Sequence, residues 1–395
     1  MVPKGWEVLH LKDVASKIQD GNYGADYPKA DEFVASGIPF LTSKVIGGIG
    51  TINPDKFDYI KEEKHQSLKK AQIVAGDILF TNRGANVGTI AIVPDYIATA
   101  NIGPQLTLVR CNDCILKEYL FQFLRGSFFQ KQIQQRDSGS AMNFFGIKDT
   151  ERFKVLVPSL SEQKRIAQIL STWDKAISVT EKLLANSQQQ KKALMQQLLT
   201  GKKRLLDENG VRFNGKWEKK LLSDVADVYQ PKTISQSMMS DSGYPVYGAN
   251  GVIGFYQEFN HETEQIAVTC RGSTCGIVNW TQAKSWITGN AMVINTDNYS
   301  YVSKKFLFYT LNGSDLKYLI SGSGQPQITG NIKTHIINLP CIEEQQKIAT
   351  VLSAADAEIY TLEKKLACLR DEKKALMQQL LTGKRRVKVD EAVAA

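Results

Sequence analysis

The sequence predicts an α+β protein: two mixed α/β globular domains joined by two long helices that form an antiparallel coiled coil, with a pseudo-two-fold internal repeat. Three observations lead to this prediction. A twelve-residue segment occurs twice without change, each copy ends a stretch of about 40 residues without proline or glycine, and short apolar runs separated by polar turns precede each stretch. A chain of 395 residues, 43% of them hydrophobic, is long enough for two or three domains.

The repeated segment is KKALMQQLLTGK, which occupies residues 191–202 and again 373–384, an offset of 182 residues. Further matches at the same offset extend this repeat upstream over more than forty residues. At the other end of each half, residues 6–15 match residues 217–226 at an offset of 211, beginning with Trp-Glu and ending with Asp-Val-Ala. Each half therefore opens and closes in the same way, which indicates two copies of one structural unit.

Weaker matches lie between these ends, at offsets of 183 to 189. They predict a shared topology in globular parts whose sequences have diverged. From Trp6 to Arg83 there are 77 positions, and from Trp217 to Arg271 there are 54, so most of the length difference precedes the Arg-Gly pair. The matched groups are Arg83-Gly84 with Arg271-Gly272, Thr99 and Asn101 with Thr288 and Asn290, and Ser138-Gly139-Ser140 with Ser321-Gly322-Ser323.

The stretches 161–200 and 343–382 are rich in Gln, Lys, Leu, Ala and Glu, and each is expected to form one helix. Prolines precede them, and Gly201 and Gly383 follow as C-terminal caps. Apolar residues recur at alternating spacings of four and three, the pattern of a coiled-coil seam. The predicted seam residues are Ile166, Leu170, Trp173, Ile177, Leu184, Leu194 and Leu198 in the first helix, and Ile348, Leu352, Ile359, Leu362, Leu366, Leu369, Leu376 and Leu380 in the second.

Lys191 and Lys373 occupy equivalent seam positions, and two interpretations of them stay open. A polar seam residue can fix the register of a helix pair. Alternatively, the lysine stems extend outward to solvent at a splayed end. The predicted boundaries are a first globular domain at 1–158, helix 159–201, linker 202–215, a second globular domain at 216–340, helix 341–383 and a basic, flexible tail at 384–395.

The globular halves combine short strands with helical patches at 116–135 and 303–319. Polar, glycine-rich turns follow the strands, and a net charge of +9 favours a polyanionic partner. Arg pairs with guanine and Asn or Gln with adenine, so such turns are candidates for reading DNA bases, although for any single residue local hydrogen bonding within the turn is the simpler interpretation. The candidates are Asn22, Tyr23, Asn82, Arg83, Asn86, Arg136, Ser140, Asn143, Tyr247, Asn250, Arg271, Ser273, Thr274, Gln325 and Gln327.

Several classes of protein are not expected. The longest apolar stretches are shorter than a membrane span, and the first ten residues lack the core of a signal peptide, so we expect a cytoplasmic protein without membrane contact. Six cysteines are too few for a disulfide framework. Cys111 and Cys114 have the C-x2-C spacing of a zinc site, but the next pair, Cys270 and Cys275, has the wrong spacing and lies far away in the sequence, so no metal site is expected. Walker, dinucleotide-binding, zinc-protease and amino-methyltransferase motifs do not occur, which predicts no catalytic residues.

A nuclease-like pattern can also be drawn in the first half of the chain. Pro54-Asp55 followed by Glu62-Glu63-Lys64 resembles a Pro-Asp, Glu-x-Lys motif that holds Mg²⁺. No apolar strand carries these residues, so a solvated charged surface is the simpler interpretation. A self-contained nuclease and a coiled-coil adaptor without a DNA role are the alternative functions.

The two Trp-Glu…Asp-Val openings and the two helices ending in KKALMQQLLTGK resemble the DNA specificity subunit of type I restriction–modification systems, over essentially the whole chain. The resemblance implies a non-catalytic subunit with two target recognition domains, each reading one half of a bipartite site on double-stranded DNA. It also implies that the helices set the spacer and bind two methyltransferase subunits, and that restriction subunits join them. S-adenosylmethionine, ATP and Mg²⁺ are expected in those partners and no cofactor in this chain. Because the two halves differ, the target should be asymmetric.

Overall fold

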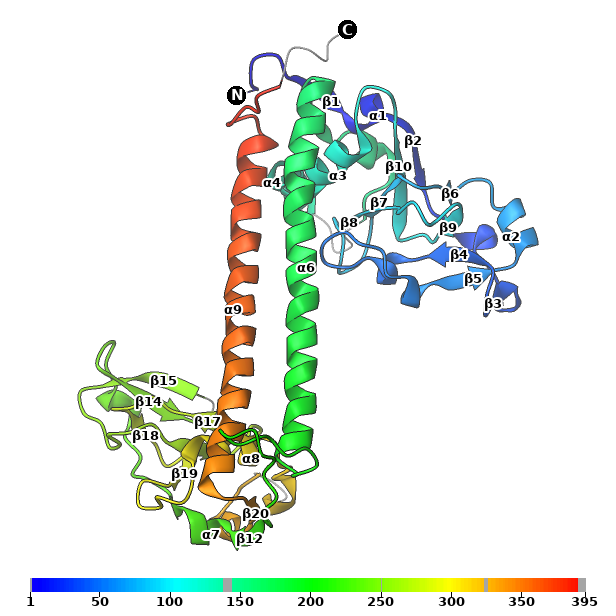
Figure 1. Ribbon diagram of the computed structural model, residues 1–395. Coiled ribbons are helices and arrows are strands. Elements are labelled where there is room, and N and C mark those ends of the chain that lie inside the picture. The colour runs from blue at the N-terminus through cyan, green and yellow to red at the C-terminus, as the bar shows by residue number, and fades with distance from the viewer. Residues whose placement is uncertain (1, 138–143, 250, 323–325, 390–395) are drawn as a thin grey trace. The chain divides into compact units, whose positions relative to one another are not determined.

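The computed structural model describes residues 2–137, 144–249, 251–322 and 326–389, with the backbone alone for Arg136 and Asp137. The chain divides into two compact units. Unit 1 comprises Met1–Glu181 with Lys365–Ala395, and unit 2 comprises Lys182–Lys364. Each unit therefore combines one globular part with a segment of each long helix (Figure 1).

A four-stranded antiparallel sheet with the same topology lies in each unit, as the internal repeat predicts. The apolar runs before the two Arg-Gly pairs form the third strand in each sheet, β7 and β16, whose residues are all buried. In spatial order the strands are β2 (Ala15–Asp20), β10 (Leu106–Cys111), β7 (Ile78–Thr81) and β8 (Ile90–Ile92) in unit 1, and β13 (Asp227–Tyr229), β19 (Ala291–Asn295), β16 (Ile266–Thr269) and β17 (Val278–Trp280) in unit 2.

A two-stranded antiparallel ribbon joins the start of each globular part to its end. The strand after each Trp pairs with the strand that leads into a long helix, and a short helix follows the first strand. The matching ends of the two halves are thus neighbours in space within each unit. The elements are β1 (Glu7–His10), α1 (Leu11–Val14) and β11 (Lys154–Val157) in unit 1, and β12 (Glu218–Leu221), α7 (Leu222–Val225) and β20 (Ile336–Leu339) in unit 2.

The remaining sheet differs between the units. In both units one strand, β4 in unit 1 and β14 in unit 2, pairs with an antiparallel neighbour on one side and a parallel neighbour on the other. Unit 1 adds β3, β6 and the helix α2 (Glu62–Ser67), all before Arg83, where the longer sequence is found. The strands in order are β3 (Phe33–Val34), β5 (Asp58–Ile60), β4 (Ile38–Leu41), β9 (Ala100–Ile102) and β6 (Gln72–Ile73), against β15 (Gly251–Tyr256), β14 (Tyr244–Gly248) and β18 (Trp286–Ile287).

The helical patch at 116–135 is two helices rather than one. The chain turns at Gly126, where a Cβ atom would lie 3.0 Å from Cδ1 of Leu381, so a side chain there would crowd this leucine, which directly follows the second long helix. The helices of the globular parts are α3 (Lys117–Arg125), α4 (Ser127–Asp137), α5 (Ile147–Glu151) and α8 (Lys304–Asn312), with 3₁₀ turns at Gly24–Asp26, Ala30–Glu32, Ser43–Val45, Pro54–Lys56, Gln236–Met238, Lys317–Leu319 and Gly330–Thr334.

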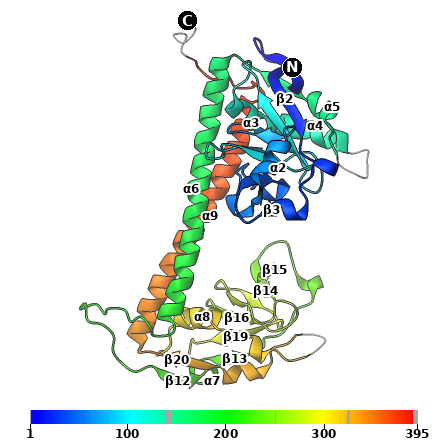
Figure 2. The ribbon, with the colours of Figure 1, turned by 90° about the vertical axis from the view of Figure 1, so that its right-hand side faces the viewer.

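The two long helices are α6 (Leu160–Leu198) and α9 (Ile342–Leu380), each of 39 residues. Gly201 and Gly383 follow them with φ of 70° and 66°, the left-handed conformation of a C-terminal cap. Within each unit the segments of α6 and α9 run antiparallel, side by side (Figures 1 and 2). In the first unit, for example, Glu181 pairs with Arg370 and the earlier residue Asp174 pairs with the later residue Lys373.

The seam of the helix pair is continuous with the core of each globular part. Ile166 and Leu170 of α6 belong to the same buried cluster as Phe80 and Phe153 of unit 1. In unit 2, Leu352 of α9 is part of the cluster that contains the four-stranded sheet. Every predicted seam residue is buried or half-buried. Complete burial of an aliphatic side chain contributes about 1.5–3 kcal/mol, so the fully buried seam residues hold each globular part to its helix segments.

Candidate nucleic-acid interface

The Arg-Gly turn of unit 1 follows β7 and lies against the segment after residues 138–143. The amide of Phe145 donates to the carbonyl of Asn82 at 2.9 Å, and Arg83 and Phe144 form a β-bridge. The guanidinium of Arg83 stacks on the Phe144 ring, 4.4 Å from its centre. Gly84 has a φ of 87°, which L-residues rarely adopt, and this makes the tight turn possible.

The Arg-Gly turn of unit 2 is built in the same way. It follows β16, and the amide of Gly272 donates to the carbonyl of Pro326 at 3.1 Å. Arg271 and Gln327 form a β-bridge, and Gly272 has a φ of 81°. The weak matches between the two halves therefore mark equivalent places in the fold: in each unit the Arg-Gly turn pairs with the chain that follows a Ser-Gly-Ser sequence.

Asn22 and Asn82, two of the predicted base-reading residues, are fully buried. The amide of Asn22 donates to the carbonyl of Ile102 at 3.3 Å, and that of Asn82 donates to the hydroxyl of Thr107 at 2.9 Å. Thr107 in turn donates to a carboxylate oxygen of Asp20 at 2.6 Å. These bonds hold the turns on the sheet, and base contact by either asparagine requires them to open.

Tyr247 of unit 2 is also buried, at 7% exposure. Its hydroxyl accepts a hydrogen bond from the amide of Gln282 at 3.1 Å. Its carbonyl accepts bonds from the amide and the hydroxyl of Thr288, both at 3.0 Å. In this arrangement Tyr247 connects β14 to the chain that follows β18.

The other described candidates are accessible. Tyr23 is 55% exposed, and Nζ of Lys70 lies 4.5 Å from the centre of its ring, which places a cation and an aromatic face together at the surface. No hydrogen bond or ion pair joins the side chain of Arg271 to another described residue, so this guanidinium is available to a ligand. The exposed candidates are Tyr23, Asn86, Arg271 and Ser273, and the half-buried ones are Arg83, Thr274 and Gln327.

Five candidates cannot be placed. Ser140, Asn143, Asn250 and Gln325 lie outside the described residues, and only the backbone of Arg136 is described, near the end of α4. Their role stays a prediction from the sequence.

The two lysines at equivalent seam positions form cross-helix ion pairs. Nζ of Lys373 lies 2.5 Å from Oδ1 of Asp174, and Lys191 pairs with Asp356, the residue equivalent to Asp174. Burial, reinforced by the nearby charge of Arg125, lowers the pKa of Lys373, although Asp174 acts in the opposite direction. Of the two interpretations left open by the sequence, these contacts favour a role in helix register over extension to solvent.

A second ionic contact occurs at equivalent places in the two units, and the sequence did not lead us to predict it. Arg386, in the segment expected to be a flexible tail, binds the buried carboxylate of Glu162 through two bonds of 2.7 and 2.8 Å. Arg204, in the expected linker, binds the buried Glu344 at 2.5 and 2.6 Å. The signal was present in the sequence, because both the arginines and the glutamates recur at the offset of 182.

The same arginines hold the start of each globular part. A nitrogen of Arg386 donates to the carbonyl of Lys4 at 2.8 Å, and one of Arg204 donates to the carbonyl of Gly215 at 3.0 Å. Lys4 and Gly215 are equivalent at the offset of 211. Residues near the two ends of the chain are therefore in contact in unit 1, at the place that the linker occupies in unit 2.

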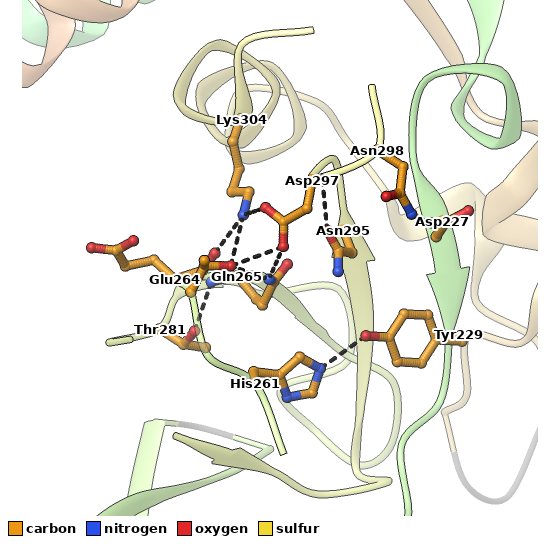
Figure 3. A network of polar contacts seen from close by, with 11 residues as sticks. Asp227, Tyr229, His261, Glu264, Gln265, Thr281, Asn295, Asp297, Asn298 and Lys304 are labelled. Atoms are coloured by element: carbon orange, nitrogen blue, oxygen red, sulfur yellow. Dashed lines mark hydrogen bonds and ion pairs between the residues drawn. The ribbon is translucent and has the colours of Figure 1, made fainter. Parts of the chain in front are cut away.

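A further polar network lies in unit 2, where α8 begins (Figure 3). Lys304 pairs with Asp297 at 2.5 Å and donates to the carbonyl of Glu264 at 2.7 Å, and the amide of Gln265 donates to Asp297 at 3.0 Å. His261 bonds the hydroxyl of Tyr229 at 2.9 Å. Burial lowers the pKa of His261, so the neutral ring is favoured. The bonds of Lys304 join α8 to the loops around β16 and β19, and the bond of His261 joins β13 to the chain that precedes β16.

The nuclease-like residues do not form a site. Glu62, Glu63 and Lys64 lie on the helix α2 instead of a strand, and Lys64 pairs with Glu32 at 3.1 Å. The amide of Asp55 is bound to the side chain of Asn53 within a 3₁₀ turn. The described residues contain no group of three or more His, Cys, Asp or Glu side chains arranged to hold a metal ion. No helix in the described part of the chain has the length and hydrophobicity that a membrane span requires.

Comparison with known proteins agrees with the repeated architecture. The family described as type I restriction modification DNA specificity domain matches residues 3–186 and 214–368. The chain is 28% identical to the putative type I restriction enzyme MjaX specificity subunit of Methanocaldococcus jannaschii, over 98% of this chain and 95% of the relative. It is 25% identical to the type I restriction enzyme MjaVIII specificity subunit of the same organism, over 98% and 94%.

Solved structures share the fold. The S subunit of a type I restriction–modification system from M. genitalium matches with a TM-score of 0.66 over 96% of both chains, at 14% identity. A chain from a structural study of complex assembly and conformational transition in the type I restriction–modification system matches with a TM-score of 0.56, at 18% identity, over 98% of this chain and 100% of that one. The two segments that match the family cover most of the chain, and this chain therefore belongs to the family of type I restriction–modification DNA specificity proteins.

Proposed function

We propose that this protein is the non-catalytic subunit that gives a type I restriction–modification enzyme its DNA sequence specificity. Each unit carries one target recognition domain, and each domain reads one half of a bipartite site. The observation that carries the proposal is one scaffold with two different sets of loops. The four-stranded sheets share a topology, whereas the sheets that include β4 and β14 differ in strand number. Because the two target recognition domains differ, the two half-sites differ and the target is asymmetric.

The long helices are proposed to set the number of base pairs between the half-sites. A helix of 39 residues is about 58 Å long at 1.5 Å per residue. This length corresponds to about 17 base pairs at 3.4 Å each, an upper limit for the separation of the half-site centres. Insertion of equal helical segments into α6 and α9 should lengthen the spacer and leave both half-sites unchanged.

The proposed partners are double-stranded DNA, two methyltransferase subunits and, where the host encodes them, restriction subunits, in the cytoplasm of a prokaryote. The chemistry belongs to these partners. S-adenosylmethionine is the methyl donor for adenine in the methyltransferase subunits, and ATP and Mg²⁺ serve the restriction subunits. The relatives' names as specificity subunits support this division of labour.

The decisive experiment is co-expression of this chain with methyltransferase subunits of its host, followed by genome-wide mapping of methylated adenine. We expect one asymmetric bipartite motif. Replacement of residues 2–158 by the corresponding segment of another family member should change one half-site and leave the other intact. Methylation that does not depend on this chain, or a swap that alters both half-sites, would contradict the proposal.

Two outcomes would point to the alternative functions. Cleavage of DNA by the purified chain with Mg²⁺ alone, lost in Asp55→Ala, would indicate a self-contained nuclease. Absence of any salt-dependent binding to duplex DNA would indicate an adaptor, because neutralisation of phosphates by Lys and Arg makes DNA affinity fall steeply with salt.

A further inference from the structure

A chain of buried hydrogen bonds in unit 1 ends at the guanidinium of Arg83. It begins at the carboxylate of Asp20, the last residue of β2, which is 8% exposed. The hydroxyl of Thr107 in β10 donates to Oδ1 of Asp20 at 2.6 Å. The side-chain amide of Asn82 donates to the same oxygen at 3.3 Å and to the hydroxyl of Thr107 at 2.9 Å. Nε of Arg83 donates to the side-chain carbonyl of Asn82 at 3.2 Å, which completes a set of four residues that we call the arginine relay.

The carboxylate of Asp20 fixes the direction of each bond in the arginine relay. A carboxylate accepts hydrogen bonds and an amide nitrogen donates them, so the hydroxyl of Thr107 gives its proton to Asp20 and accepts from Asn82. The amide nitrogen of Asn82 is thereby turned toward Thr107, and its oxygen faces Arg83. Thr107 and Asn82 are fully buried, so water does not compete for these bonds. The position of Nε of Arg83 is therefore determined by buried residues of unit 1.

The guanidinium of Arg83 is held in two ways. Its plane stacks on the ring of Phe144, and the bond from Nε to Asn82 fixes its rotation within that plane. No described residue accepts a hydrogen bond from the terminal nitrogens Nη1 and Nη2 of Arg83. Two such nitrogens can pair at once with O6 and N7 of guanine. Arg83 thus presents a fixed pair of donors to a ligand.

Unit 2 keeps the arginine but not the relay. The strand registers of the two sheets identify the residues of unit 2 at the same positions, which are Gln230 for Asp20, Met292 for Thr107, Cys270 for Asn82 and Arg271 for Arg83. The amide nitrogen of Gln230 lies 3.7 Å from Sγ of Cys270, so these two positions are neighbours in both units. A methionine has no proton to donate, and a cysteine has no carbonyl oxygen for a guanidinium. The orientation of the Arg271 guanidinium is therefore not fixed by a described residue.

We propose that the arginine relay determines one base of the half-site read by unit 1, by holding Arg83 for a two-pronged contact with guanine. Asp20 is a positioning residue that acts through Thr107 and Asn82. The inference rests on the proposed function and adds one base and the residues that select it. A guanidinium that is already oriented loses little conformational freedom on contact. It also cannot turn away from a base that lacks matching acceptors, so the wrong base leaves its donors unpaired.

A base is a better ligand than a phosphate for this arginine. Phosphate contacts carry no sequence information, and a lysine can make them as a point charge. A buried set of polar groups that fixes the orientation of an arginine matters where the geometry of the contact distinguishes bases, because both donors must meet O6 and N7 at once. We therefore expect a guanine at one position of this half-site, contacted in the major groove.

The test uses the full-length chain, co-expressed with the methyltransferase subunits of its host, and genome-wide mapping of methylated adenine. Arg83→Ala should reduce the preference for guanine at one position of one half-site about tenfold or more. Asp20→Ala and Thr107→Val should reduce it at the same position about fivefold, the effect of one hydrogen bond. Thr107→Ser, which retains the hydroxyl, should keep the wild-type preference. The other half-site should stay unchanged in all four variants.

Thr81 provides a matched control. It is buried, lies next to Asn82 and has a hydroxyl without a hydrogen-bond partner among the described residues. It pairs with Leu106, the neighbour of Thr107, so its side chain points to the opposite face of the sheet. Thr81→Val should therefore leave the recognised sequence unchanged. In an Arg83→Ala background, Thr107→Val should have no further effect on base preference, because a positioning residue acts only through the arginine.

Each contrary result has a distinct meaning. An unchanged guanine preference in Arg83→Ala, or in both Asp20→Ala and Thr107→Val, would overturn the inference. Relaxation of both half-sites by Thr107→Val, or a further loss in the Arg83→Ala background, would show that Thr107 only supports the fold, and would also overturn it. A loss of duplex affinity in Arg83→Ala that is equal for all sequences would indicate a phosphate contact instead. Failure of the wild type to direct methylation would contradict the proposed function itself.

Discussion

Lys373 of α9 and Asp174 of α6 form an ion pair with 2.5 Å between Nζ and Oδ1, and Lys373 is only 5% exposed. Asp174 also accepts hydrogen bonds from Gln122 at 2.7 Å and from Arg125 at 3.2 Å, both in α3. One carboxylate thus connects both long helices to a helix of the globular part. In unit 2, Asp356 does the same through Lys191 and through Tyr309, whose hydroxyl lies at 2.6 Å.

This arrangement predicts unequal costs for removing the two partners. Asp174→Leu leaves Lys373 buried beside Arg125 without an anion, and should destabilise the helix pair by about 3 kcal/mol. Lys373→Leu leaves Asp174 with Gln122 and Arg125, and should cost about 1 kcal/mol. The double variant should recover part of the larger loss, because it removes the buried cation of Lys373 and leaves only Arg125 without its anion. Hydrogen exchange of α6 and α9 peptides measures these changes, and equal costs for the two single variants would contradict the assignment.

The contact of Arg386 with Lys4 predicts that a circularly permuted chain folds. In unit 2 the ten residues 205–214 connect the equivalent Arg204 to Gly215. A copy of these residues joining Arg386 to Lys4, with new ends between the exposed Glu208 and Asn209, should preserve both half-sites in methylation mapping. New ends inside α6, between Gln188 and Gln189, should abolish folding because they interrupt the helix. If neither permuted chain folds, the native ends of the chain are needed for folding.

Arg271 is predicted to contribute to reading one half-site. Its exposed guanidinium has no partner among the described residues, whereas Arg83 stacks on Phe144 and donates to Asn82 at 3.2 Å. Arg271→Ala should relax one position of one half-site, at a cost of about 1–3 kcal/mol. Arg271→Lys keeps the charge but not the two-pronged geometry, so it should also relax the sequence if the contact is to a base. Recovery of wild-type specificity by the lysine variant would instead indicate a phosphate contact.

Unit 2 should lose stability before unit 1 as the pH falls below neutrality. Burial lowers the pKa of His261 and of His335, both in unit 2. A histidine with a lowered pKa binds its proton less readily when folded, so its stabilising contribution is complete above the unfolded pKa of about 6.5 and decreases below it. Burial raises the pKa of Asp174, but the charges of Arg125 and Lys373 lower it by more, so the pKa lies below its ordinary value. Protonation of Asp174 should therefore reduce stability only below about pH 4.

Hydrogen exchange at pH 7.5 and 5.5, corrected for intrinsic rates, distinguishes the two units. Peptides of the β13-β19-β16-β17 sheet should lose protection at the lower pH, whereas those of β2-β10-β7-β8 should not. The variant His261→Gln with His335→Gln should be less sensitive to this change of pH. Equal loss of protection in both sheets would show that these histidines do not determine the response.

The long helices were predictable because their signals are local: the absence of proline and glycine between 161 and 200, and an apolar seam that recurs at the offset of 182. The burial of Asn22 was not predictable. Its acceptor, the carbonyl of Ile102, lies 80 residues further along the chain, and a turn motif does not reveal where an amide points. The parallel pairing of β4 with β9 escaped prediction for the same reason, since the strands meet only after the fold has formed.

Each unit takes one segment of a long helix from each repeat, and Arg386 closes unit 1 across the two ends of the chain. A half-length ancestor with a single copy would have had to supply that second segment from another molecule, as a homodimer reading a palindrome. In this chain the repeat makes the same contacts intramolecular. Each globular part can therefore change in sequence without a matching change in the other.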